Sequence, residues 1–295
     1  MSEVLSKATL FDPELVKDLI DKVKGKSSLA VLSAQKPIPF NGSKEFVFTM
    51  DNEIDIVAEN GKYSHGGMSL EPITIIPIKV EYGARVSEEF MTASEEEQID
   101  ILKAFNDGFG KKMASGMDIA AMHGINPRTG QASAVVGNNN FDAKVTQVVT
   151  YIADTPDANI EAAIEMIEGN DGEVTGLAIA PAVRAHLAAM TKSTGEKLYP
   201  EFAFGGQPTN LGANKLHINK TVSHGASTDR AIVGDFANMF KWGYSKEVTM
   251  EVIPYGDPDN SGVDLKGSGQ VYIRARGYIG WGIFNGDSFA RVVSE

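Results

Sequence analysis

The sequence has 295 residues, of which 42% are hydrophobic and 22% are charged, the balance of a globular protein with a sizeable core. Its 27 Lys and Arg against 39 Asp and Glu give a net charge of −12, which excludes a free-standing nucleic-acid-binding protein because phosphate contacts need clustered cations. The chain has no Cys, which excludes disulfides, thiolate metal sites and a Cys nucleophile.

The N-terminal segment, residues 1–25, lacks the apolar core of a signal peptide, and no run of about 18 apolar residues occurs in the chain. We therefore expect the protein to stay in the cytosol or to be assembled there. Asp12 and Pro13 are a good helix start, and Leu19 and Val23 follow at helical spacing. The sequence predicts a short amphipathic helix that packs either on its own domain or on a neighbouring molecule.

Residues 36–70 have the pattern of a long two-stranded hairpin. Apolar residues alternate over 46–50 and again over 54–57, with a turn between them, and Pro72 bounds the segment. Because an isolated hairpin is marginal in water, one this long that carries Phe and Ile needs a surface to lie on. That surface belongs either to the same subunit or to the next one, and in the second case the hairpin is an assembly device.

A strand region and the clearest helix of the chain come next. Residues 73–86 predict an edge or bulged strand, because Pro77 removes a hydrogen-bond donor from the ladder. A helix is predicted over 94–122, where Ser94 and Glu97 form a capping box and apolar residues recur at steps of three and four. At a rise of 1.5 Å per residue this helix would span roughly 43 Å.

From residue 141 onward helices alternate with short strands. Helices are predicted at 145–152, from Pro156 to Gly169 and from Pro181 onward, and strands at 174–180, 216–222, 231–233, 248–252 and 271–283. This pattern predicts an α+β fold with a compact block at about 141–247. The segments that flank the block carry the long helix and the long strands, and they can form one discontinuous second domain.

The sequence contains few signs of chemistry. The five His form neither an H-E-x-x-H helix nor a close ligand cluster, and no nucleophile elbow, P-loop or dinucleotide motif occurs. We therefore predict no catalytic residue, no cofactor and no metal ligand, and we expect the protein not to be an enzyme. The loop Asp257–Asp264 is a candidate ion site because Asp257, Asp259 and Gly262 match EF-hand positions, although the twelfth position is Ser268 in place of Glu.

The order of these elements resembles the major capsid proteins of tailed bacteriophages, which have the Hong Kong 97 fold. The strings that carry the resemblance are the Ser-x-Glu-type segment at 87–90, the strand that ends in Pro181, the Gly-x-x-Leu-Tyr-like element at 195–199, Gly-Asp-Phe at 234–236 and the Arg-rich strand at 274–277. They follow one another in the order found in the family, over nearly the whole chain. The tail at 288–290 departs from the family by reversing its usual Ala-Phe order.

The resemblance implies an α+β, Hong Kong 97-like capsid fold with named parts. These are an N-terminal arm at 1–39, an extended β-hairpin loop at 40–75, a peripheral domain at 76–134 and 248–295 that contains the spine helix 94–122, and an axial domain at 135–247. As function, the resemblance implies the major capsid protein of a tailed bacteriophage, which self-assembles into hexamers and pentamers of an icosahedral shell that encloses double-stranded DNA.

The resemblance also implies partners and a location. The expected partners are copies of the chain, a portal and a separate scaffolding protein, because the chain begins almost at the arm. Packaged DNA would line the inner surface without sequence-specific binding, and no membrane is involved. The expected location is the virion capsid, assembled in the host cytoplasm.

Two other functions stay open. An encapsulin-type nanocompartment shell protein has the same fold and would enclose cargo enzymes in place of DNA. A small α+β enzyme built on the central block would instead be a monomer with a defined ligand pocket. Nucleic acid or cargo inside purified particles discriminates the two shell functions, and a small-molecule thermal shift would favour the enzyme.

Overall fold

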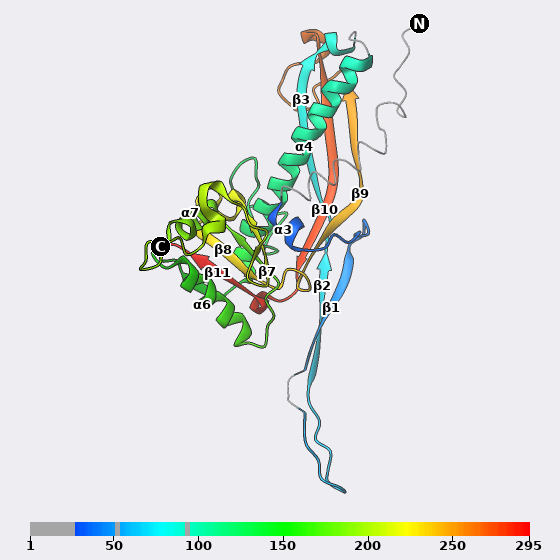
Figure 1. The fold of residues 1–295 in the computed structure, drawn as a ribbon. Helices are drawn as coiled ribbons and strands as arrows, with labels where there is room; N and C mark the ends of the chain where they lie inside the picture. Colours follow the sequence, from blue (N-terminus) through cyan, green and yellow to red (C-terminus); the bar gives the residue numbers. More distant parts are fainter. Residues whose placement is uncertain (1–26, 51–53, 92–94) are drawn as a thin grey trace.

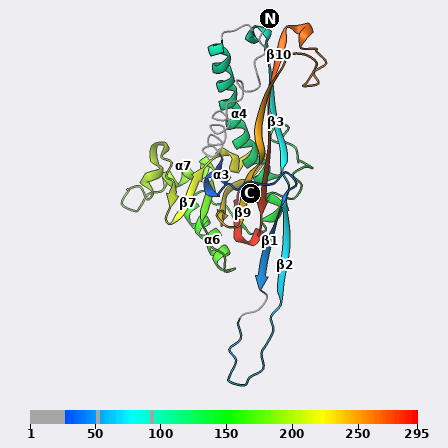
Figure 2. The same cartoon turned by 90° about the vertical axis from the view of Figure 1, so that its right-hand side faces the viewer.

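The structure is a computed structural model that describes residues 27–50, 54–91 and 95–295. The predicted N-terminal helix and Ser94 of the predicted capping box lie outside the described residues. Figure 1 shows a rounded block of helices and strands, a long helix beside long strands that rises from one side of it, and a thin hairpin that projects toward the opposite end. Figure 2, turned by 90°, shows the same elongated arrangement.

Helices and strands are mixed along the whole described chain. The helices are α3 (Ser28–Leu32), α4 (Glu95–His123), α5 (Phe141–Lys144), α6 (Pro156–Glu168) and α7 (Pro181–Ala189). The strands are β1 (Ser43–Met50), β2 (Met68–Ile75), β3 (Ile78–Ser87), β4 (Val148–Thr150), β5 (Gly176–Ile179), β6 (Asn210–Leu211), β7 (Asn214–Ile218), β8 (Asp229–Gly234), β9 (Phe240–Ile253), β10 (Gln270–Ile283) and β11 (Phe289–Val293). The described strands form a two-stranded sheet β1-β2, a three-stranded sheet β3-β10-β9 and a six-stranded sheet β4-β11-β8-β5-β7-β6. This mixture confirms the predicted α+β class.

The three-stranded sheet and α4 form the upright part of the molecule in Figure 1. The central strand β10 pairs antiparallel with β3 on one edge and with β9 on the other. The 29-residue α4 buries Phe109, Met113 and Met117 of its apolar stripe in the main core, which confirms the long helix. Residues 35–38 cover the outer edge of β9, where the Lys36 N–H donates to the Trp242 carbonyl at 2.9 Å.

The six-stranded sheet is the centre of the rounded block and is covered on both faces. Alternate residues of a strand point to opposite faces, and β5 follows this rule. Leu177 and Ile179 lie in a core with residues of α6 and α7, whereas Ala178 packs in the core that contains residues of α3, α4 and α5. The C-terminal end of the long helix is therefore held against one face of the block.

The hairpin is longer than the sequence predicts. β1 pairs with β2 from Ser43↔Ile75 to Met50↔Met68, so Pro72 lies inside the ladder, opposite Phe46. A two-stranded ribbon leaves each strand one free edge, which is where a residue without an N–H can be placed. The predicted strand at 54–57 is wrong, because these residues form part of the unpaired tip.

The predicted helix at 145–152 is also wrong. Its spacing of Val residues fits a helix, but Val148–Thr150 forms β4, which pairs parallel with β11 at the chain's other end. β-Branched residues suit a strand, and the partner is too far along the sequence to be seen in a local pattern. One strand spans the expected boundary between 247 and 248, because β9 already begins at Phe240, and β11, from the segment after that boundary, joins the sheet of the block.

We predict that Gly282→Ala destabilises the root of the hairpin. A Cβ at Gly282 would lie 2.8 Å from Cγ1 of Ile75, a buried residue at the end of β2. Overpacking of this kind costs about 1–3 kcal/mol of unfolding free energy, measurable by urea denaturation. Gly108→Ala is the matched control, because its Cβ would meet no atom within 4 Å and Ala favours a helix by up to about 1 kcal/mol. Equal stability of Gly282→Ala and the wild type would contradict the close packing.

Candidate functional site

The stem of the hairpin has one apolar face that no other segment of the described residues covers. Directly paired residues of antiparallel strands point to the same side, so the register places Phe46, Pro72, Leu70 and Met68 on one face. Phe46, Leu70 and Met68 are 60%, 58% and 75% exposed. A row of exposed apolar side chains on a projecting ribbon is a surface for another macromolecule.

The tip of the hairpin continues this surface. Ile54, Ile56 and Tyr63 are each more than 90% exposed. The tip of the hairpin extends away from the block and from α4 in Figure 2, and none of the described residues buries these three side chains. We therefore expect the apolar residues of the hairpin to be buried only in contact with a partner.

The root of the hairpin is fixed to the body of the molecule. Ile75 is buried against Gly280 and Gly282 of β10, where the lack of side chains leaves room for it. The Lys241 ammonium lies 2.8 Å from a carboxylate oxygen of Glu45 in β1. A partly exposed ion pair adds little stability, but together with the buried Ile it sets the direction in which the ribbon leaves the sheet.

A buried carboxylate, Asp118 of α4, holds three segments together. It accepts hydrogen bonds from the Ser27 hydroxyl, from the Ser28 N–H at 2.7 Å, from the Leu29 N–H at 3.3 Å and from the Thr221 hydroxyl at 3.0 Å. Burial raises the pKa of Asp118 to about 6, although these hydrogen bonds act against the shift. Asp118 thus joins the long helix, the entry to α3 and the turn at 220–223.

A second polar cluster lies at the end of the same helix. His123 Nδ1 is 3.1 Å from Oδ2 of Asp142, and its Nε2 lies 2.9 Å from the Thr221 carbonyl oxygen. Both ring nitrogens face acceptors, which favours the imidazolium form, so the pKa of His123 is raised although burial opposes the charge. Arg291 of β11 completes the cluster, with Nη2 at 2.9 Å from Asp229 and 3.0 Å from Asp142.

The cluster contains a possible set of metal ligands. One ligand atom each of His123, Asp142 and Asp229 lies within 4.8 Å of the others. Because Arg291 already forms ion pairs with both carboxylates, the arrangement suits an ion network better than a metal. The expectation that no His has close ligand partners is corrected here, since the fold brings together residues from three separate elements.

The loop Asp257–Asp264, the candidate ion site, has an internal cation. Arg85 of β3 places Nη2 at 2.9 Å from Asp257 and 2.6 Å from Asp259, and at 2.9 Å from the Val263 carbonyl oxygen. The hydrogen bond from Arg85 holds the pKa of Asp259 well below its usual range. The guanidinium occupies the position among the carboxylates that the sequence pattern suggests for an ion.

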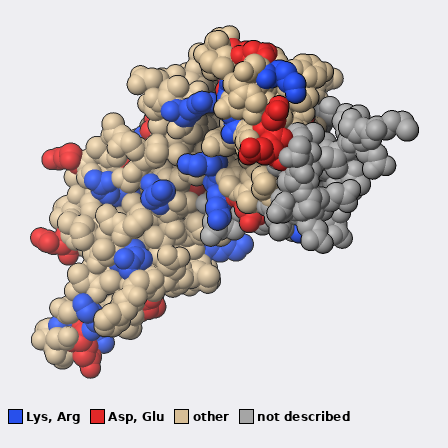
Figure 3. All heavy atoms as spheres, turned by 90° about the horizontal axis from the view of Figure 1, so that it is seen from above, with Lys and Arg blue, Asp and Glu red and all other residues tan. Residues whose placement is uncertain are grey.

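The surface charges do not form a single-sign face in the view from above. Figure 3 shows Lys and Arg side chains scattered among Asp and Glu over this side of the molecule. Among the described residues, no helix is both long enough and apolar enough to cross a membrane.

A spine helix along long strands, a projecting hairpin and a compact α+β block together define the Hong Kong 97 class of shell protein. The model of the phage capsid family matches residues 8–294. A chain from Mycobacterium phage Ogopogo matches with a TM-score of 0.77 and 30% identity, over 92% of this chain and 92% of that chain. The chain therefore belongs to the phage capsid family and is a major capsid protein of a tailed bacteriophage, a structural protein and not an enzyme.

Other solved structures share the fold. A chain from Gordonia phage Cozz has a TM-score of 0.76 and 21% identity, over 92% of this chain and 87% of that chain. The capsid of a native GTA particle computed with C5 symmetry has a TM-score of 0.64 and 12% identity, over 90% of this chain and 89% of that chain. A search of the curated proteins gives no match. The location that the family implies is the virion capsid.

We predict that the free energy of unfolding of the unassembled protein rises when the pH is lowered from 7 to 5. The raised pKa of Asp118 means that its stabilising contribution is complete below the unfolded value of 3.8 and is lost as the pH rises through about 6. Asp118 alone contributes about 1 kcal/mol over this interval. Urea denaturation at the two pH values measures the rise.

Asp118→Asn cannot titrate, so its stability should rise less over the same pH interval. Asp154→Asn, in an exposed turn, is the matched loss of one carboxylate and should behave as the wild type. An identical pH dependence in Asp118→Asn and the wild type would contradict the role of this carboxyl.

We also predict that calcium leaves the melting temperature of the wild type unchanged, because Arg85 already forms ion pairs with both Asp257 and Asp259. Arg85→Ala keeps both carboxylates and removes their cation, so limited proteolysis should cut the 256–264 loop faster. Added calcium should partly restore protection in this variant. Arg128→Ala, which removes an exposed Arg elsewhere, should change neither property. A calcium-induced rise in the wild-type melting temperature would contradict this account.

Proposed function

We propose that this subunit assembles with copies of itself into hexamers and pentamers that close an icosahedral shell around double-stranded DNA. The observation that carries the proposal is the hairpin, whose exposed apolar residues require a surface outside the subunit. Membership of the phage capsid family supplies the partner, since a shell is built from many copies of one chain.

The hairpin acts as a strap across the neighbouring subunit. Phe46, Leu70 and Met68 are exposed on the stem, and burial of a large apolar side chain contributes about 1.5–3 kcal/mol. Because the root is fixed by Ile75 and by the Glu45–Lys241 pair, the ribbon loses little freedom when it docks. A preorganised apolar ribbon is thus suited to contact the same place on every neighbour.

The remaining parts take the roles that the Hong Kong 97 fold gives them. Residues 1–39 act as the arm, 40–75 as the extended loop, and the spine helix with β3, β9 and β10 as the peripheral domain. The six-stranded block acts as the axial domain around the five-fold and six-fold positions. We assign β11 to the axial domain, because it pairs with β4 and β8.

The net charge supports DNA as the content of the shell, and the family supports the other partners. A net charge of −12 suits a wall that encloses DNA without sequence-specific contacts, because weak repulsion lets the packed DNA slide. We propose a separate scaffolding protein, a portal and assembly in the host cytoplasm. Nucleic acid in purified particles supports this function, whereas protein cargo would support an encapsulin-type compartment.

We predict that Leu70→Asp abolishes shells without unfolding the subunit. The side chain is exposed, so stability should change by less than about 0.5 kcal/mol, while a charge in the docked apolar face blocks assembly. Negative-stain electron microscopy of the purified protein, co-expressed with its scaffold if needed, measures the yield of shells.

Ser69→Asp is the matched control, since it places the same charge one residue away on the opposite face of the ribbon. It should assemble better than Leu70→Asp. Normal shells from Leu70→Asp would show that the apolar face is not an interface, and absence of shells, sheets and tubes from the wild type under all conditions would overturn the proposed function.

A further inference from the structure

One aromatic side chain at the surface of the axial block is exposed and has an unfavourable backbone conformation. Phe204 is fully exposed, and its backbone lies in the left-handed region with φ 53° and ψ 31°, which is unfavourable for a residue other than Gly. Strained positions persist where the surroundings enforce them, and they cluster at functional sites. Phe204 is therefore a candidate contact residue and not a loose surface side chain.

The turn that carries Phe204 is firmly built. Phe202, two residues earlier, is completely buried and lies edge-on to Tyr199 with ring centroids 6.4 Å apart. The Gly206 N–H donates to the Ala203 carbonyl at 2.9 Å. A Cβ at Gly206 would lie 2.0 Å from the Glu201 carbonyl oxygen, so the turn requires Gly there. We call this turn, residues 200–206, the Phe204 knob.

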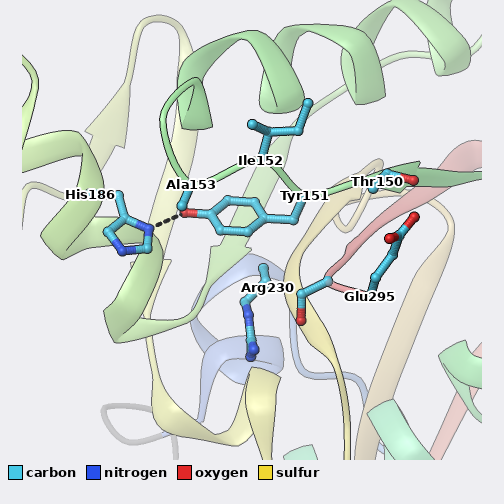
Figure 4. Close-up of a pocket in the computed structure, with 8 residues that line it drawn as sticks. Thr150, Tyr151, Ile152, Ala153, His186, Arg230 and Glu295 are labelled. Atoms are coloured by element: carbon cyan, nitrogen blue, oxygen red, sulfur yellow. Dashed lines mark hydrogen bonds between the residues drawn. The ribbon is translucent and has the colours of Figure 1, made fainter.

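The same block carries a cavity of about 480 Å³ between β4, α7 and the C-terminus. Its wall includes Tyr151, Ile152, Ala153 and His186, shown in Figure 4. The Tyr151 ring stacks on His186, and the two side chains are joined by a 2.6 Å hydrogen bond between the Tyr hydroxyl and Nδ1. The cavity is open, partly apolar and large enough for a phenyl ring. We call it the α7 cavity.

The knob and the cavity lie on opposite flanks of α7. Arg184 of this helix donates to the Phe202 carbonyl oxygen of the knob at 3.0 Å, whereas His186 faces Tyr151 in the cavity. Two residues along an α-helix differ in direction by about 200°, so these side chains leave opposite sides of α7. A knob and a hole on opposite flanks match head to tail, and a head-to-tail contact closes into a ring when the rotation between neighbours divides the full circle.

The knob and the cavity carry one pair of opposite charges. Glu201 is exposed on the knob, and Arg230 lines the cavity, whose wall also includes the acidic Glu295. Neither Glu201 nor Arg230 forms an ion pair within the described part of the chain, where the Arg230 guanidinium donates only to the Ser223 hydroxyl. Insertion of the knob into a neighbour's cavity would bring a carboxylate toward an unpaired cation, which favours one orientation of the contact.

We propose that the Phe204 knob of each subunit inserts into the α7 cavity of the next copy and so closes the ring of axial blocks. This inference rests on the proposed function, because it needs rings of identical copies. It adds the partner surface and the residues that specify it. Phe204 supplies the apolar anchor, and Glu201 and Arg230 fix the direction of the contact.

The absence of Cys in the chain permits a direct test by disulfide crosslinking. The variant Phe204→Cys with Ala153→Cys, assembled and mildly oxidised, should give a ladder of covalent oligomers that ends at five and six subunits on a non-reducing gel. Co-assembly of the two single variants should stop at dimers, and each single variant alone should stay monomeric. Phe204→Cys with Met166→Cys, which places the second thiol on the exposed side of α6, should also stay monomeric.

Two outcomes would overturn the knob and leave the proposed function standing. One is crosslinking of Phe204→Cys to itself, which would mean that the Phe204 side chains meet one another. The other is the absence of crosslinks in preparations where electron microscopy shows closed shells. If the wild type forms no shells, sheets or tubes in the same preparations, the proposed function and the knob fall together.

A charge exchange tests the orientation separately. Glu201→Arg and Arg230→Glu, each added to the double-Cys variant, should lower the yield of crosslinked rings several-fold. Combination of the two exchanges should restore the yield, which a purely structural role of either residue would not do. A combined variant as poor as the single variants would overturn the assigned ion pair.

Discussion

The buried end of the spine helix is the constraint on which the rest of the structure depends. α4 extends far beyond the block in Figure 1, and its C-terminal residues 117–123 are all buried. Asp118 there accepts hydrogen bonds from the start of α3 and from the 220–223 turn, and His123 binds the carbonyl of the same turn. A buried carboxylate that loses its donors is costly, so these contacts are retained together or lost together. They fix the angle between the long helix and the axial block.

With that angle set, the subunit has extensions at two ends. The three-stranded sheet runs beside α4 at one end, and the hairpin projects at the other end with its root fixed by Ile75. Within the part of the chain that the structure describes, Phe46, Leu70 and Met68 of the stem and Ile54, Ile56 and Tyr63 of the tip are exposed. The subunit therefore has a packed core but leaves the apolar surface of its hairpin exposed, as expected of a subunit that is completed by its neighbours in a shell.

Local patterns were sufficient for features whose partners are near in sequence. The apolar stripe of α4, the start of α6 at Pro156 and the alternation in β10 all survive in the structure. The long hairpin and its need for a surface, on the same subunit or on the next one, were predicted, but its register was not, because Pro72 reads as a boundary and is in fact paired with Phe46. β4 was missed for a similar reason, since its partner β11 is more than 140 residues away.

The polar sites were the least predictable part. His123, Asp142, Asp229 and Arg291 come from four elements, and no spacing rule connects them. Arg85 neutralises a loop more than 170 residues later, which no local motif could reveal. The family strings, by contrast, are local and appear in order, so the class of protein could be predicted from the sequence. The ion pairs and hydrogen bonds between distant residues required the fold.

The most direct test of the central claim is a cryo-electron microscopy reconstruction of particles formed by the full chain. The account predicts a closed shell in which each hairpin lies on an adjacent subunit, with Phe46, Leu70 and Met68 buried at that contact. A reconstruction in which the hairpin folds back on its own subunit, or in which it extends into solvent without a partner, would contradict it.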